Sequence, residues 1–123
     1  MKNFLLVFLG GGLGSGLRFL ISNSLNQHEK ILPFGTFFIN MIGCFLIGLI
    51  LGYAQKENTI NPNQTLLLAT GFCGGFTTFS AFANENLELI KNGEIFNFSV
   101  YTIGSIFIGI LAVFIGLYLT KNI

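Results

Sequence analysis

Four long apolar segments, separated by short polar stretches, run the length of the chain. They extend over residues 3–25, 34–53, 64–90 and 96–120, and the stretches between them read NQHEK, QKENTINPN and KNGE. A helix needs about 20 residues, at about 1.5 Å each, to cross a hydrocarbon core of roughly 30 Å. The pattern therefore predicts an all-α membrane protein with four transmembrane helices. We expect residues 1–123 to form a single transmembrane domain in the lipid bilayer.

The composition excludes several other classes of protein. The chain is 52% hydrophobic and only 9% charged, which a soluble domain of 123 residues could not keep in solution. The net charge of +1, without a basic cluster, argues against nucleic acid as a partner. Cys44 and Cys73 lack a CxxC motif or a histidine neighbour and are expected to be small apolar residues, and His28 alone supports no metal site. No set of nucleophile, base and orienting group lies within the spans, so we do not expect an enzyme.

The lysines divide almost evenly between the two sides of the membrane. Four spans put both termini and the 54–63 loop on one side. Arg18 aside, the count is Lys2, Lys56 and Lys121 against Lys30 and Lys91. The excess of lysine and arginine on one side that normally fixes the orientation in the membrane is missing. Either the insertion machinery or a partner subunit then decides the orientation, or the chain inserts both ways. Four short helices leave almost no interior for a pathway, whereas inverted-repeat transporters build their sites between two halves, which favours an antiparallel, dual-topology homodimer.

Small residues recur at helical spacing in three of the spans. In the first span, two overlapping GxxxG pairs allow a neighbouring helix to approach closely. In the fourth span a stripe of small residues predicts a helix interface, and the second span has two glycines suited to the same purpose. These residues are Gly10, Gly12, Gly14 and Gly16; Ser105, Gly109, Ala112 and Gly116; and Gly48 and Gly52.

The centre of the third span, ATGFCGGFTTFSAF, is poorly suited to a continuous helix. Gly71, Gly74 and Gly75 each weaken a helix by about 1 kcal/mol relative to alanine, and Thr77 and Thr78 are β-branched. We therefore predict a break between Gly74 and Thr78, near the midplane of the bilayer. Unwound backbone at this depth is tolerated only where it is buried in protein or lines a polar cavity.

Such a break has consequences for ions of both signs. The released carbonyl groups need a donor or a cation, and two chains meeting at a two-fold axis would offer four oxygens to Na+. The helix that restarts presents its positive N-terminal end, which favours an anion. Phe76, Phe79 and Phe82 recur every three residues on this second half-helix, and the electropositive edges of their rings suit an anion. With the amide N–H donors of Asn40, they predict a weak, narrow anion path.

Simpler structural roles remain open for the same residues. The phenylalanines also fit a stripe facing lipid or the protein core. Thr36 and Asn40, four residues apart on one helix face, also fit hydrogen bonds between helices. Arg18 is expected to be a structural anchor, because an arginine at the bilayer centre costs about 2.5–3.5 kcal/mol.

Three segments resemble one family over essentially the whole chain and in the same order. These are GGGLGSGLRF, PFGTFFINMIGCFLIG, and GFC followed by GGFTTFSAF. They are similar to the Fluc (CrcB) fluoride channels. The resemblance implies an antiparallel, dual-topology homodimer with two fluoride pores and a central structural Na+. It also implies passive fluoride export across the bacterial plasma or inner membrane, which would protect cytoplasmic enzymes.

The resemblance also assigns roles to residues. Asn40 would bind fluoride, Phe79 and Phe82 would form the aromatic box of the pore, and the carbonyl groups of Gly74 and Thr77 would hold Na+. Five further residues match polar positions that line or support the pathway: Thr36, Ser80, Glu85, Tyr101 and Ser105. Arg18 matches the family's arginine of the first span. Ala81 departs from the commoner TTFSTF form, which puts local hydrogen bonding in doubt.

Two other functions compete with the channel. A small dual-topology, proton-coupled multidrug exporter needs a carboxylate deep within a span, but the first two spans have none and Glu85 is off-centre. A non-transporting assembly subunit would account for the small residues. It would leave Asn40 and the broken third span without a purpose.

Overall fold

The computed structural model describes residues 1–25 and 32–122, and every regular element among them is a helix. Four helical runs are long and apolar enough to cross a membrane: α1 (Lys2–Leu25), α2 (Phe34–Ala54), the run Pro62–Lys91, and α6 (Ile95–Asn122). The prediction of an all-α protein with four membrane-spanning helices is thereby confirmed. His28 and Lys30 lie outside the described residues.

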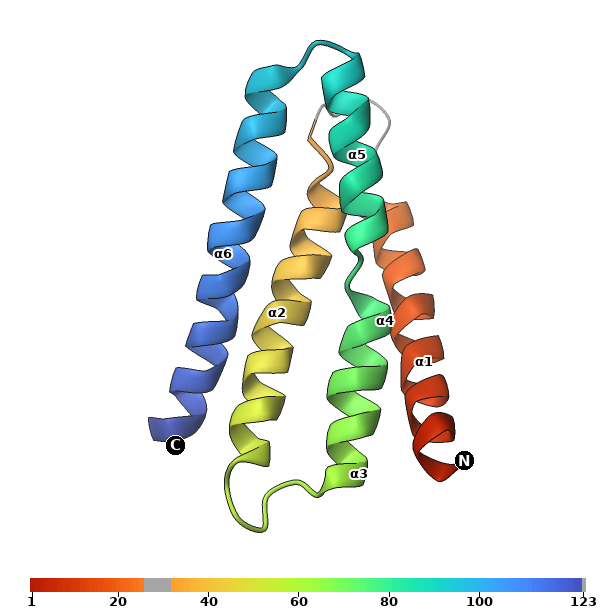
Figure 1. Cartoon of the computed structure of the whole chain (residues 1–123), viewed down its shortest axis with the longest axis vertical. Helices are drawn as coiled ribbons and strands as arrows, with labels where there is room; N and C mark the ends of the chain where they lie inside the picture. Colours follow the sequence, from red (N-terminus) through yellow and green to blue (C-terminus); the bar gives the residue numbers. More distant parts are fainter. Residues whose placement is uncertain (26–31, 123) are drawn as a thin grey trace.

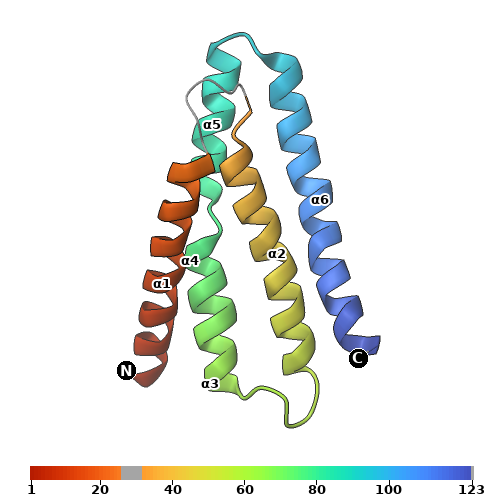
Figure 2. The same cartoon turned by 180° about the vertical axis from the view of Figure 1, so that it is seen from behind.

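The four runs lie side by side, with the third span (Pro62–Lys91) between α1 and α2 and with α6 on the far side of α2 (Figures 1 and 2). Both termini and the connection between α2 and the third span lie at one end of the molecule (Figure 1). The connection from the third span to α6 lies at the other end. This arrangement is the one that four consecutive spans require.

The third span is made of four consecutive helical segments: α3 (Pro62–Thr65), η1 (Leu66–Cys73), α4 (Gly74–Phe76) and α5 (Phe79–Lys91). It starts with a capping box in which the Asn61 side chain accepts from the N–H of Gln64 and the Gln64 side chain accepts from the N–H of Asn61, both at 2.9 Å. The segment η1 is a π-helix. Nothing in its sequence, LLLATGFC, predicts this form, which is rare and often found at functional sites.

The chain is extended at Thr77 and Thr78, between α4 and α5. Their φ and ψ angles are −82° and 157°, and −147° and 121°. Thr78 then starts α5 as its N-cap, because its Oγ1 accepts from the N–H of Ala81 at 3.2 Å. We call these two residues the interruption. Its position at the midplane of the bilayer stays a prediction.

The expectation that Phe76 shares a half-helix with Phe79 and Phe82 is wrong. Because Thr78 is the cap of α5, Phe76 falls at the end of α4, on the other side of the interruption. It is buried and its ring stacks on that of Phe72, with the ring centroids 5.5 Å apart. Phe76 therefore belongs to the packed core of the first half of the span.

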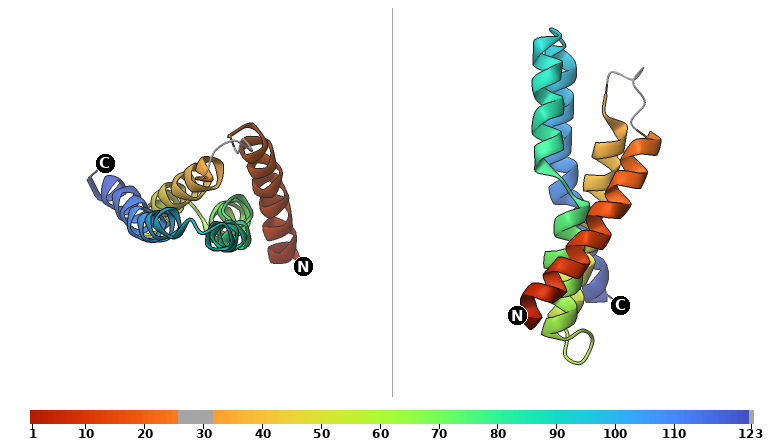
Figure 3. Two further views of the ribbon diagram at one scale, coloured as in Figure 1. Left: turned by 90° about the horizontal axis from the view of Figure 1, so that it is seen from above. Right: turned by 90° about the vertical axis from the view of Figure 1, so that its right-hand side faces the viewer.

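Helix α1 crosses η1 and α4 obliquely and packs closely against both (Figure 3). A Cβ atom on Gly10 or Gly14 would overlap the backbone of the third span, so this GxxxG pair makes a helix contact as predicted. Gly12 and Gly16 have open space around them. Only one of the two overlapping pairs is therefore used for packing within the chain.

Helices α2 and α6 pack through glycines on both sides. A Cβ atom on Gly48 would overlap the backbone at Val113, and one on Gly116 would overlap the backbone at Phe45. Gly109 faces the side chains of Met41 and Cys44. The two glycines of the stripe predicted in the fourth span are therefore confirmed as part of an interface with the second.

The outer surface of the molecule is strongly apolar. Phe8, Leu13, Phe96, Phe107 and Ile110 are all well exposed in the single chain. Side chains of this kind on spanning helices are suited to contact with lipid chains or with other helices in the bilayer.

Candidate functional site

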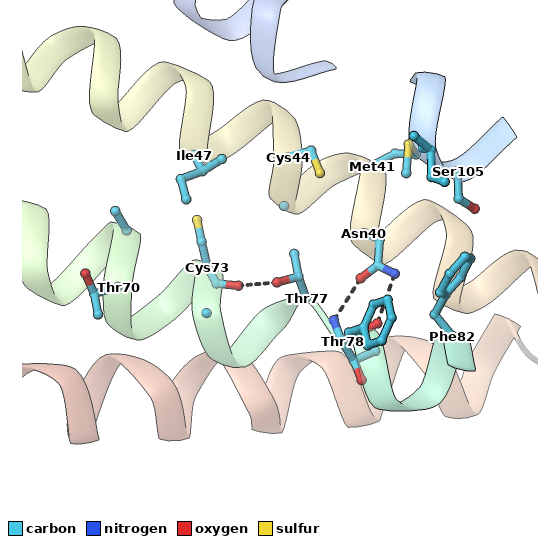
Figure 4. A pocket seen from close by; sticks show the side chains of 15 residues that line it. Asn40, Met41, Cys44, Ile47, Thr70, Cys73, Thr77, Thr78, Phe82 and Ser105 are labelled. Atoms are coloured by element: carbon cyan, nitrogen blue, oxygen red, sulfur yellow. Dashed lines mark hydrogen bonds between the residues drawn. The ribbon is translucent and has the colours of Figure 1, made fainter. Parts of the chain in front are cut away.

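A cavity of about 570 Å³ lies beside the interruption, between α2, the third span and α6 (Figure 4). Most of its wall is apolar, and its polar groups gather where the backbone is extended. Six residues assigned to the site from the sequence line this cavity: Asn40, Gly74, Thr77, Phe79, Phe82 and Ser105.

Asn40 is hydrogen-bonded to the extended backbone of Thr78 through both ends of its amide group (Figure 4). Its Oδ1 accepts from the N–H of Thr78 at 2.8 Å, and its Nδ2 donates to the carbonyl of Thr78 at 3.2 Å. An amide NH2 group has two N–H donors, so one remains beyond this pair. Asn40 thus replaces, from α2, the hydrogen bonds that the interrupted helix cannot make.

The interruption removes the usual donors from several carbonyl groups, among them those of Gly74 and Thr77. In a continuous helix, the N–H of Thr78 would donate to Gly74 and that of Ala81 to Thr77. Here these groups donate to Asn40 Oδ1 and Thr78 Oγ1 instead. The carbonyls of Gly74 and Thr77, the two assigned to a cation from the sequence, have therefore lost their helical partners beside the cavity.

A second group of polar side chains, the Glu85 cluster, joins three helices. Thr36 of α2 donates to Glu85 Oε2 at 2.7 Å, and the Tyr101 hydroxyl of α6 donates to Glu85 Oε1 at 3.0 Å. Both carboxyl oxygens of Glu85, on α5, are held in this way. The structure therefore brings together three positions that were only separate candidates in the sequence.

Phe82 lies between the cavity and the Glu85 cluster. Its ring centroid is 5.8 Å from that of Phe79 and 5.0 Å from that of Tyr101. Phe79 is 78% exposed in the single chain. The hydroxyl of Ser105 is buried with no hydrogen-bond partner among the described residues. A series of aromatic rings thus connects the cavity with the polar Glu85 cluster.

Two of the candidates lie outside both groups. Ser80 is exposed, and its hydroxyl oxygen is 3.2 Å from that of Thr78. Arg18, on α1, contacts the third span at Gly75, where its Nε donates to the carbonyl at 3.0 Å. Arg18 therefore joins α1 to the third span, and its role as a structural anchor stays a prediction.

The sequence did not reveal three other polar contacts. Ser15 also donates to the carbonyl of Gly75, at 3.3 Å, and its place three residues before Arg18 on α1 was the available signal. Thr78 is the N-cap of α5, which a threonine at a helix start can indicate. Thr102 donates to the buried Asn86 at 3.1 Å, a pairing that depends on how α5 and α6 pack.

Together these features define a small multi-pass membrane protein with polar groups gathered at non-helical backbone within a span, as in channels and transporters. The family model described as "CrcB-like protein, Camphor Resistance (CrcB)" matches residues 5–117. The chain belongs to this family.

Curated relatives are similar over the whole chain. One from Gloeothece citriformis is 52% identical over 123 residues, covering 99% of both chains. One from Flavobacterium psychrophilum is 43% identical over 124 residues, with complete coverage of both, and one from Phocaeicola vulgatus is 46% identical over 122 residues, covering 98% of this chain and all of the relative. Each of the three is named "Fluoride-specific ion channel FluC". These names describe channels and do not favour the multidrug exporter.

Proposed function

We propose that this protein is a fluoride-selective channel that exports fluoride passively across the bacterial plasma or inner membrane. The observation that carries the proposal is the shared name of relatives that are 43–52% identical over essentially the full chain. The similarity extends over all four membrane-spanning runs of this chain. Fluoride is therefore the first ion to test.

The chemistry of the cavity is consistent with weak binding of a small anion. Ring edges of Phe79 and Phe82 are electropositive, Asn40 has a second amide N–H, and the Ser105 hydroxyl is buried without a partner among the described residues. No arginine or lysine of the described chain lines the cavity. Weak contacts of this kind suit conduction, because an ion that is held loosely is able to leave.

The Glu85 cluster would continue this route toward one membrane surface. Thr36 and Tyr101 hold the carboxyl group of Glu85 in place. Tyr101 contacts Phe82 with its ring and Glu85 with its hydroxyl, so it joins the aromatic rings of the cavity to the cluster. Ser80, exposed next to Thr78, would face the pathway once a second chain covers that side.

We further propose that two chains assemble as an antiparallel homodimer with two pores. Phe79 is largely exposed, and Gly74 has open space around it in the single chain. The released carbonyls of Gly74 and Thr77 also lie beside the cavity. Backbone carbonyl groups without hydrogen-bond donors are unfavourable in lipid. An inverted copy would cover these groups and would complete each pore.

A structural Na+ fits these carbonyl groups by their chemistry. Backbone carbonyl oxygens without hydrogen-bond donors are the ligands that a dehydrated alkali cation takes in membrane proteins. Gly74 and Thr77 would hold the ion, two oxygens from each chain. The ion would supply positive charge to a group of carbonyl dipoles that otherwise repel one another.

Ion efflux from liposomes tests the proposed function. Purified protein is reconstituted into vesicles loaded with either fluoride or chloride, and efflux is followed with ion-selective electrodes. We expect rapid release of fluoride and hardly any of chloride. Equal release of the two ions would contradict selectivity, and release of neither would contradict a passive channel.

A further inference from the structure

Gly75 is the third carbonyl group that the interruption deprives of its helical donor. In a continuous helix it would accept from the N–H of Phe79, but Phe79 begins a new helix. Two donors from α1 take that place: Arg18 Nε at 3.0 Å and Ser15 Oγ at 3.3 Å. Gly75 thus differs from Gly74 and Thr77, whose carbonyls have no such replacement from α1.

The contact depends on close packing of α1 against α4. A Cβ atom on Gly75 would overlap the backbone of Gly11, so the two backbones touch here. Ser15 lies one helical turn beyond Gly11, and Arg18 almost one turn further, on the same side of α1. Both donors are therefore delivered by the helix that approaches most closely at this point.

The interruption is consequently held from two sides. Asn40 of α2 binds the backbone of Thr78, and α1 binds the carbonyl of Gly75. Gly74 and Thr77 flank these tethered positions. The carbonyl of Thr77 shares a planar peptide unit with the N–H of Thr78, so the bond from that N–H to Asn40 fixes its direction. The carbonyls of Gly74 and Gly75 belong to neighbouring peptide units joined at Gly75, which packs against Gly11, so holding the Gly75 carbonyl limits the rotation left to that of Gly74.

We propose that Arg18 and Ser15 are positioning residues for the cation site. By binding the Gly75 carbonyl, they keep it from competing as a ligand and restrict the direction of the neighbouring Gly74 carbonyl, while Asn40 restricts that of Thr77. The hydrogen bond from a guanidinium is the stronger of the two, because bonds to charged groups exceed those between neutral ones. This inference rests on the Na+ site proposed above.

The test measures how Na+ stabilises the purified protein in detergent. The melting temperature (Tm) is followed as Na+ replaces N-methylglucamine at constant ionic strength. Arg18→Gln should raise the Na+ concentration for half-maximal stabilisation by about tenfold or more. A tenfold change corresponds to about 1.4 kcal/mol. Ser15→Ala and Arg18→Lys should shift this concentration less. If Arg18→Gln does not fold, the same measurement on Ser15→Ala and Arg18→Lys tests the proposal.

Ser24→Ala is the matched control. Ser24 lies on the same helix and its hydroxyl donates to Leu20 of α1, so its removal should not change the Na+ dependence. If Arg18 and Ser15 were merely structural, the variants would lower Tm equally with and without Na+, and the inference would be overturned. A wild-type Tm that ignores Na+ would also overturn it, whereas fluoride efflux remains a separate test of the channel.

Discussion

At the scale of single residues, the amide of Asn40 connects the architecture with the proposed pathway. It accepts from the N–H of Thr78 and donates to the carbonyl of the same residue. Asn40→Asp would keep the acceptor, replace the donor by a second oxygen and add negative charge beside an anion path. We expect fluoride efflux to fall at least about a hundredfold, because like charges in a low-dielectric site repel strongly.

The comparison for this variant is Cys44→Ala, measured in the same vesicles. Cys44 lies one helical turn from Asn40 and lines the same cavity, but supplies no strong polar group to it. Its removal should leave efflux near the wild-type rate. Wild-type conduction by Asn40→Asp would remove Asn40 from the pathway and leave it a structural role only.

The hydroxyl of Tyr101 gives a second prediction at this scale. Tyr101→Phe keeps the ring contact with Phe82 but removes a donor to Glu85. We expect a loss of about 1–3 kcal/mol in the free energy of unfolding, because a partly buried acceptor is left with fewer partners. Thermal unfolding in detergent measures it. Tyr118→Phe is the control, since Tyr118 is exposed on α6, and equal losses in the two variants would contradict the prediction.

At the scale of helices, two glycines of α1 separated by a single leucine have opposite surroundings. A Cβ atom on Gly14 would overlap the backbone of Phe72, whereas one on Gly12 meets open space. Gly14→Ala should therefore destabilise the protein by about 1–3 kcal/mol through overpacking. Gly12→Ala should be neutral, or stabilising by up to about 1 kcal/mol, because alanine favours helix. Thermal unfolding of the two variants decides this, and a similar loss in both would mean that the Gly12 face also packs closely.

The helices show which features a sequence can predict in such a protein. The four spans follow from hydropathy alone, since each must reach across the bilayer. The positions of Gly10 and Gly14 follow from spacing. The π-helix at Leu66–Cys73 does not, because its apolar residues fit an α-helix equally well.

Within the site, the predictable part was the residue type and the unpredictable part was the partner. Of the predicted break between Gly74 and Thr78, the two threonines are extended, whereas Gly74 and Gly75 lie in the helical segment α4. Asn40 predicted a need for hydrogen bonds. That Asn40 meets Thr78, or that Arg18 meets Gly75, depends on how whole helices cross. Phe76 was misplaced because spacing of three residues does not reveal a cap at Thr78.

At the scale of the whole molecule, the contact of Arg18 bears on orientation. Its Nε donates to the carbonyl of Gly75 within the third span. The lysines of the described residues are Lys2, Lys56 and Lys121 toward one end of the molecule and Lys91 toward the other, and Lys30 lies outside the described residues. So small a difference gives little bias, because orientation depends on an excess of Lys and Arg near one side.

Two variants with opposite charge bias test the proposed antiparallel dimer. One adds lysines beside Lys2 and Lys121, at the end of the molecule that holds both termini, and the other adds them beside Lys91, at the opposite end (Figure 1). Each variant alone should insert in one orientation, as tag accessibility in intact cells would report, and should show little fluoride efflux because no inverted partner is present. Co-expression of the two should restore efflux, since each supplies the other with an inverted copy. A single variant that is fully oriented and still conducts at the wild-type rate would show that antiparallel pairing is not required for the pore.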